Sequence, residues 1–151
     1  MENQFAITHR NREILLHYLT AVSEEKLFAI PEGFNNNIWW NIAHTVVTQQ
    51  VLVYKFSGLP MMVNNDMVAK YMKGTFPTGT PSPEEIATVK ELLFSTVKQT
   101  EKDYSNGVFK TFSSYTTSAK FQLDSVEDAI TFNVYHEALH IGAIIALLKK
   151  V

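Results

Sequence analysis

Hydrophobic residues recur at helical spacing along most of the chain, and the first two helical segments differ in how many sides are apolar. Residues 7–22 place isoleucine, leucine, tyrosine and valine on one face, which predicts an amphipathic helix. A short polar-capped piece at 23–27 follows it. Residues 37–56 are apolar on nearly all sides, which is typical of a helix in the middle of a bundle or at a subunit interface.

The third and fourth helical segments have recognisable starts. Ser82 is a preferred N-cap residue, and Pro83 suits the first helical position, so a helix is expected from there to about Tyr104. The fourth helix starts at Asp124 or Ser125, because Ser125 and the acidic residue three positions later resemble a capping box. It runs almost to the C-terminus.

Two stretches lack a clean helical pattern. Residues 58–81 are rich in Gly, Pro, Asn and Thr and predict a long crossover with one turn of helix around 66–72. A crossover of this length lets the second and third helices run parallel. Residues 108–123 predict an extended loop or a short hairpin. The fold class expected is therefore all-α, a four-helix bundle with one long crossover, as a single domain over residues 1–151.

Composition mainly excludes certain partners and kinds of chemistry. The 151 residues are 46% hydrophobic and 19% charged, an ordinary globular balance. The formal net charge is −2 with no basic stripe, so no nucleic-acid partner is expected. The chain has no cysteine, which excludes disulfides, thiolate ligands and a cysteine nucleophile. The polar start and the lack of a long apolar run predict a cytoplasmic protein with no membrane partner.

Two of the five histidines form a pair that can bind metal. His136 and His140 are four residues apart in the fourth helix, so both imidazoles lie on one face, one turn apart. With Glu137 they also match the H-E-x-x-H pattern of zinc peptidases, in which the glutamate is the general base. Residues 141–151 contain no His, Asp or Glu, so a third ligand must come from upstream.

His44 is the best candidate for that third ligand. It lies on the apolar second helix, where an imidazole needs a polar partner to be stable. Three imidazoles leave open coordination positions, as catalytic metal sites do. A helical stripe with steps of four and three predicts that the pair faces the interior: Ala129, Asn133, His136, His140, Ala143 and Leu147. The alternative is a set of core or surface histidines that bind no metal.

Several residues near the histidines are candidates for supporting roles. Glu137 is a general base, a partner of the histidines or, most simply, a solvated side chain. Trp40 and Thr48 lie one turn before and after His44, where they wall the site or serve ordinary packing and backbone bonding. Asn133 orients a bound water or is satisfied locally.

The stretch 108–123 supplies further aromatic residues, among them Phe112 and Tyr115. Loops on a rigid scaffold often carry binding residues, and ligand pockets are often lined by aromatic side chains. These aromatics therefore line a pocket for apolar or aromatic electrophiles, or else they cover the flank of the bundle.

These features together resemble the DinB-like superfamily of bacterial proteins, which includes YfiT-like metal-dependent hydrolases and thiol-dependent S-transferases. Residues 37–44, Asn-Ile-Trp-Trp-Asn-Ile-Ala-His, are similar to the stretch that ends in the family's first histidine. Residues 136–140 are similar to its closing H-x-x-x-H, and the four-helix layout extends the resemblance to nearly the whole chain. The resemblance implies one divalent metal ion, zinc or nickel, bound by His44, His136 and His140.

Two classes of function follow from these expectations. The first is a metal-dependent enzyme that acts on a small molecule. It is either an S-transferase that uses a low-molecular-weight thiol cosubstrate or a hydrolase assisted by Glu137. The second is a non-catalytic metal- or ligand-binding bundle, with a role in stress response. Loss of a model electrophile, measured with and without thiol, discriminates them.

The second helix also predicts an assembly. It has more apolar surface than one face of a bundle uses, and Trp39 and Trp40 point about 100° apart on a helix. One tryptophan is expected to pack inside while the other meets a second subunit. An isologous homodimer is therefore expected, and the family resemblance points the same way.

Overall fold

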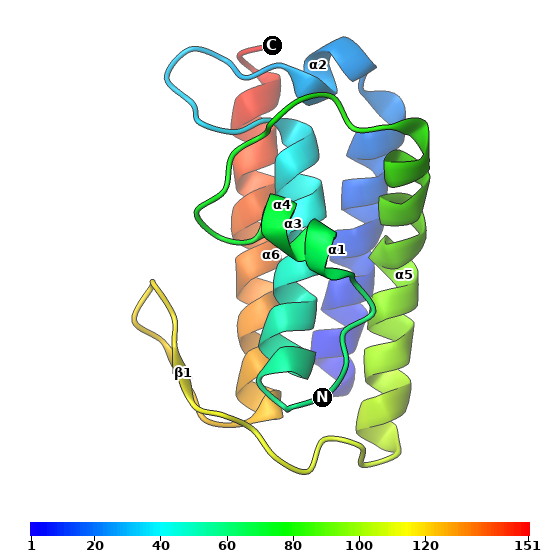
Figure 1. Ribbon diagram of the computed structural model, residues 1–151, viewed down its shortest axis with the longest axis vertical. Coiled ribbons are helices and arrows are strands. Elements are labelled where there is room, and N and C mark those ends of the chain that lie inside the picture. Colours follow the sequence, from blue (N-terminus) through cyan, green and yellow to red (C-terminus); the bar gives the residue numbers. More distant parts are fainter.

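Four long helices pack around an apolar interior in the computed structural model, which describes residues 1–151 (Figure 1). They are α1 (Glu2–Ala21), α3 (Ile38–Gln50), α5 (Pro83–Ser105) and α6 (Val126–Leu148). In Figure 1 α1 and α6 run upward while α3 and α5 run downward. Both α1 and α3 contact α5 and α6. The all-α bundle and its parallel pair of helices, α3 and α5, are confirmed.

Side-chain caps fix the starts of three of the four long helices. Asn37 accepts a hydrogen bond from the Trp40 backbone N–H at 2.8 Å, Ser82 caps α5 and Ser125 caps α6. These caps satisfy N–H groups that the first helical turn leaves without a partner. The helix predicted over 7–22 begins earlier, at Glu2, because Phe5 is buried and anchors the first turn.

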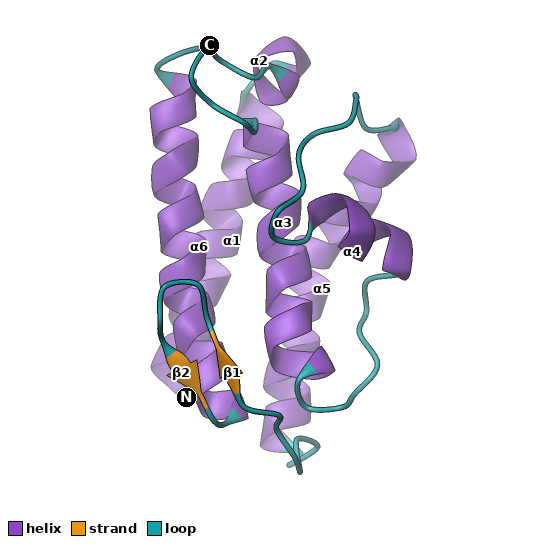
Figure 2. Cartoon of the chain, turned by 60° about the vertical axis from the view of Figure 1, so that its left-hand side comes forward, coloured by secondary structure: helices purple, strands orange, loops and turns teal.

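The shorter elements lie in the connections between the long helices. α2 (Glu24–Phe28) follows α1, and α4 (Asn65–Tyr71) interrupts the crossover from α3 to α5, as predicted. β1 (Tyr115–Thr116) and β2 (Gln122–Leu123) form an antiparallel hairpin in the stretch where a loop or hairpin was expected. Figure 2 shows the hairpin in front of the lower half of α6, with α4 on the other side of α3.

α3 does not continue as a regular helix to residue 56. After Gln50 the chain forms η1 (Val51–Lys55), a π-helical segment in the same direction. A π-helical turn holds more residues than an α-helical turn, so it changes the direction of the side chains that follow. Segments of this kind occur frequently at functional sites.

Both tryptophans of α3 are buried within the chain. Trp39 is 2% and Trp40 6% exposed. The indole of Trp39 donates a hydrogen bond to the Tyr71 hydroxyl at 2.9 Å, and that of Trp40 donates to Thr75 at 3.1 Å. The expectation that one tryptophan meets a second subunit is wrong, because the crossover folds back over α3 and covers it.

α6 has a partly exposed apolar face. The helix has 23 residues and is long and apolar enough to span a membrane by length and composition, which was not expected from the sequence. It nevertheless packs against α1 and α3 as a bundle helix. Tyr135, Leu139 and Ile145 on its outer side are exposed. α6 therefore presents apolar surface that this chain alone does not cover.

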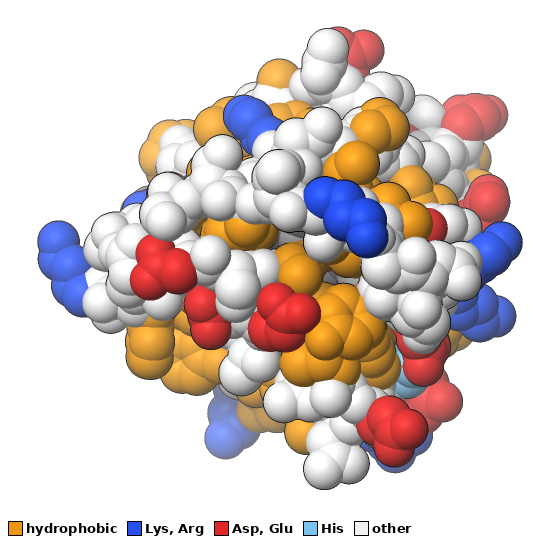
Figure 3. Space-filling model, turned by 90° about the horizontal axis from the view of Figure 1, so that it is seen from below, with side chains coloured by type: hydrophobic (Ala, Val, Ile, Leu, Met, Phe, Trp, Pro, Cys, Tyr) orange, Lys and Arg blue, Asp and Glu red, His pale blue; other side chains and the backbone are white.

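Charges of both signs are mixed at the lower end of the bundle (Figure 3). Lysine and arginine side chains are scattered there among aspartate and glutamate, with hydrophobic side chains reaching the surface between them. This end therefore presents no uniform charge to a partner.

Candidate metal centre

Three histidines from two helices converge at one point between α3 and α6. The Nε2 atom of His136 lies 3.3 Å from Nε2 of His44 and 3.1 Å from Nε2 of His140. One nitrogen from each ring lies within 4.8 Å of the other two. Imidazole nitrogens that share a tetrahedral ion at about 2.05 Å are separated by about 3.3 Å. The group of His44, His136 and His140 therefore has a spacing that could hold a metal ion.

Hydrogen bonds on the far side of two rings fix their tautomers. The Nδ1 atom of His44 lies 2.6 Å from the Tyr71 carbonyl oxygen. A carbonyl only accepts, so Nδ1 donates and Nε2 keeps a free lone pair. The Nδ1 atom of His140 likewise donates to the Asn41 side-chain oxygen at 2.7 Å. Outer contacts of this kind orient metal-binding histidines.

Burial keeps these imidazoles neutral. Removal from water lowers the pKa of His136 to about 2, with further lowering by the neighbouring His140, His44 and Arg12. Burial and the nearby His44 lower the pKa of His140 to about 3. Burial also lowers the pKa of His44, although its hydrogen bond to Tyr71 opposes the shift. Neutral imidazole is the form that binds metal.

The histidines open onto a pocket of about 480 Å³. Its floor is the face of α3 and η1 from Trp40 to Phe56, and α6 forms one wall. The end of α4 and the β1–β2 hairpin form the other walls. The ring of Trp40 stacks on His44 with centroids 4.5 Å apart. The volume is in the range of small-molecule sites.

Three of the five residues expected to line the pocket lie in its wall: Trp40, Thr48 and Tyr115. The Thr48 hydroxyl lies 3.2 Å from His44 Nε2. Phe112 is not part of this wall, although its ring packs against Phe56, which is.

Asn133 also lies outside the pocket. It donates a hydrogen bond to Glu137 at 2.8 Å in the interior of the bundle. The buried stripe of α6 shares Ala129, Asn133 and Leu147 with the predicted one, and its other members are Val126, Ile130, Glu137 and Ile144. Asn133 belongs to this stripe, whereas the two histidines lie at its edge.

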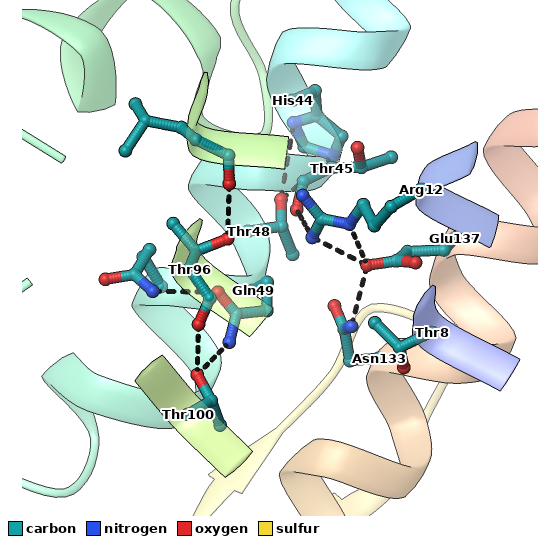
Figure 4. Close-up of polar contacts among 12 residues, drawn as sticks. Thr8, Arg12, His44, Thr45, Thr48, Gln49, Thr96, Thr100, Asn133 and Glu137 are labelled. Carbon is teal, nitrogen blue, oxygen red and sulfur yellow. Dashed lines mark hydrogen bonds and ion pairs between the residues drawn. The ribbon is translucent and has the colours of Figure 1, made fainter. Parts of the chain in front are cut away.

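Glu137 is not solvated, which corrects the simplest expectation for it. Its side chain and that of Arg12 are both 0% exposed and form an ion pair. The Arg12 Nε and Nη2 atoms donate to Glu137 Oε1 at 2.9 and 2.7 Å (Figure 4). Glu137 faces α1 rather than the pocket and is absent from the pocket wall. Its carboxylate is therefore held away from the space where a general base would act.

Arg12 connects the two helices that carry the histidines. Besides Glu137, which follows His136, its Nη2 atom contacts the carbonyl of Thr45, which follows His44, at 3.4 Å. This role was not predicted from the sequence. The sequence did contain a signal for it, because the charged Arg12 lies on the same helical face as Thr8, Leu15 and Leu19, which are buried on α1. Asn41 and Tyr71 were also missed, since only the fold brings them to the imidazoles.

Replacing Glu137 with Gln should destabilise the protein strongly. The variant leaves the Arg12 charge buried without a counter-charge, which typically costs about 3–5 kcal/mol. Urea denaturation measures the loss. The matched control is Glu13→Gln, because the Arg10–Glu13 pair is 71% and 56% exposed and should contribute less than about 1 kcal/mol. Equal losses in the two variants would contradict this assignment.

The metal-free protein should lose stability as pH falls below about 6.5. The unfolded histidines take up protons near their ordinary pKa of 6.5, whereas folded His136 and His140 stay neutral down to about 2 and 3. Over this window the unfolded state binds more protons, so acid favours unfolding. Denaturant midpoints measured between pH 7 and pH 4 test this. A variant in which both histidines are replaced by Gln should show a smaller dependence.

The comparisons with known proteins agree with this geometry. The family model described as the DinB superfamily matches residues 7–144, which include all three histidines and all four long helices in whole or in large part. No curated protein matches the chain. Since the match covers well over half of the sequence, the chain belongs to the DinB superfamily.

Proposed function

We propose that the chain is a metal-dependent enzyme acting on a small molecule, with one divalent ion held by His44, His136 and His140. The observation that carries the proposal is the position of these histidines at the wall of a pocket. Their nitrogens converge, and the pocket leaves one side of the group accessible. Structural zinc is normally enclosed by four protein ligands, whereas three ligands beside a pocket suit catalysis.

Imidazole ligands suit zinc or nickel, and both are consistent with this donor set. A divalent ion in such a site supplies Lewis acidity and lowers the pKa of a bound water or thiol. The protein's own residues orient the site. Tyr71 and Asn41 hold two imidazoles, and Trp40 covers the face of His44.

The pocket wall favours a thiol-dependent S-transferase over a hydrolase assisted by Glu137. No aspartate or glutamate lines the pocket, and Glu137 is committed to Arg12 on the other side of α6. A low-molecular-weight thiol brings its own nucleophile and needs no carboxylate base from the wall. The chain has no cysteine to supply that nucleophile itself.

Alanine at His44, His136 or His140 should remove most of the bound metal. Loss of an outer hydrogen-bonding partner alone typically weakens metal binding 10- to 100-fold, and loss of a ligand should cost at least as much. Elemental analysis of protein purified without a nickel column measures the content. The control is His9→Ala, because His9 lies apart from the group and contacts Glu101. Full occupancy in His44→Ala would exclude it as the third ligand.

The reaction class is tested by following a model electrophile, 1-chloro-2,4-dinitrobenzene, with and without glutathione or cysteine. The proposal expects loss of the electrophile that requires the thiol, the metal and His136. A hydrolase is tested in parallel with 4-nitrophenyl acetate and no thiol. Stoichiometric metal without turnover of a broad electrophile panel would favour the alternative, a non-catalytic metal- or ligand-binding bundle.

We also propose a homodimer, formed through α6 rather than α3. From Tyr135 to Ala146 the outer side of α6 carries no charged residue and exposes Tyr135 and Ile145, neither of which lines the pocket. An uncharged apolar stripe is complementary to a second copy of itself, as an isologous interface requires.

Ile145→Glu should shift the protein to monomer, because it would place a charge in this interface. The matched control is Ile7→Glu on α1, since Ile7 is 48% exposed and Ile145 is 44% exposed. Sedimentation velocity at micromolar concentration measures the change. A wild-type protein that is already monomeric, or two variants that behave alike, would count against α6 as the interface.

A further inference from the structure

The pocket beside the histidines carries two positive side chains and no negative one. Lys55 and Lys73 line it, and no aspartate or glutamate does. This local balance is opposite to that of the whole chain, which has a net charge of −2. Neither lysine takes part in any of the four ion pairs of the structure. Two lysines without a protein counter-ion therefore line one pocket.

The rest of the wall is mostly apolar. Besides the histidines and lysines it contains a few small polar groups, and ten of its 19 residues are hydrophobic, with Trp40, Phe56, Tyr115 and Phe132 as the aromatic members. Apolar walls bind apolar ligand surface, while a few polar groups fix the orientation. A ligand of this pocket should therefore combine an apolar body with a group that an ammonium recognises.

Lys55 lies at the end of the pocket far from the histidines. It is eleven residues after His44 in one continuous helical segment, which corresponds to about 15 Å along the axis. Lys73, in contrast, is two residues after Tyr71, whose carbonyl contacts His44. The pocket thus has the histidines and Lys73 toward one end and Lys55 at the other.

The π-helical segment contributes to this arrangement. Val51, Leu52 and Lys55 belong to η1, and all three line the pocket. Phe56 follows directly, and its ring stacks on Tyr115 of the hairpin with centroids 4.6 Å apart. The segment that departs from regular helix is therefore the segment that presents Lys55.

We propose that the substrate is an elongated, largely apolar molecule with an anionic group, and that Lys55 binds the anion while the reacting end reaches the histidines. This inference rests on the proposed function for its reacting end. It adds an anionic group to the apolar or aromatic electrophile that the aromatic residues alone led us to expect. A carboxylate and a phosphate share the chemistry that an ammonium recognises.

Two alternatives compete with an anion site at Lys55: the lysine binds nothing, or the metal binds the anion. Lys55 is exposed, and a lysine at a pocket rim can extend its ammonium into water and bind nothing. The metal itself can attract an anion, since carboxylates are common zinc ligands. Measurements on both metal-loaded and metal-free protein separate these two alternatives from the proposal.

The probes are decanoate and decan-1-ol, which share an apolar chain and differ in charge. Binding is followed by tryptophan fluorescence, because Trp40 lines the pocket. Decanoate should bind more tightly than the alcohol to metal-loaded and metal-free protein alike. Lys55→Met should weaken decanoate about tenfold, the effect of losing one charge-assisted hydrogen bond, and leave the alcohol unchanged. Lys98→Met, outside the pocket wall, is the control.

The outcomes are distinct. Unchanged decanoate affinity in Lys55→Met overturns the proposal, as does a preference for decanoate that disappears when the metal is removed. Equal weakening in Lys98→Met would show a general charge effect and also overturns it. Failure of His136→Ala to reduce metal content would instead overturn the proposed function, while the Lys55 result would stand on its own. The same measurement with dodecyl phosphate shows whether Lys55 also binds a phosphate group.

Discussion

The geometry of the histidine centre depends on the hydrogen bonds that the buried guanidinium of Arg12 donates to Glu137 and to the Thr45 carbonyl. This guanidinium reaches from α1 to the residue after His136 on α6 and to the residue after His44 on α3. A planar guanidinium with several donors in fixed directions can hold two acceptors at once. The relative position of the two histidine-bearing helices is therefore set by a polar contact at the level of the site, in addition to apolar packing.

Such a contact is costly to bury, and the bundle surrounds it with polar groups. Asn133 donates to the same carboxylate oxygen, and Gln49 of α3 bonds Thr100 of α5 (Figure 4). A buried ion pair is not by itself a source of stability, because both charges lose their hydration. We interpret this polar layer as a device that fixes how the helices align. This interpretation is tested by comparing the single variants of Arg12 and of Glu137 with the double variant in which apolar residues replace both.

The long connections of the fold become part of the site. The crossover from α3 to α5 supplies Tyr71 to the back of His44 and Met72 and Lys73 to the pocket wall. The hairpin between α5 and α6 supplies Tyr115, Thr117 and Ser118. Long connections without much secondary structure are uncommon in compact domains unless they serve a function. Here they enclose a space beside the histidines that two straight helices would leave open.

The sequence alone determined the bundle, the starts of α5 and α6 and the grouping of the histidines. Helical periodicity, Ser82 and Ser125 are local features, and the spacing of His136 and His140 requires only one turn of helix. The third member, His44, followed from its isolation on an apolar helix and from resemblance. These inferences succeed because each depends on residues near one another in the chain or on a single polar group that must find a partner.

Only the tertiary structure decided which way the neighbouring side chains face. A shift of one position along α6 turns a side chain by about 100°, which separates Glu137 in the interior from His136 beside the pocket. The periodic pattern was too permissive to distinguish these two registers, because histidine, asparagine and glutamate are all polar. Likewise, whether Trp40 was covered depended on where the crossover folded, and the pairing of Arg12 with Glu137 joins residues 125 positions apart.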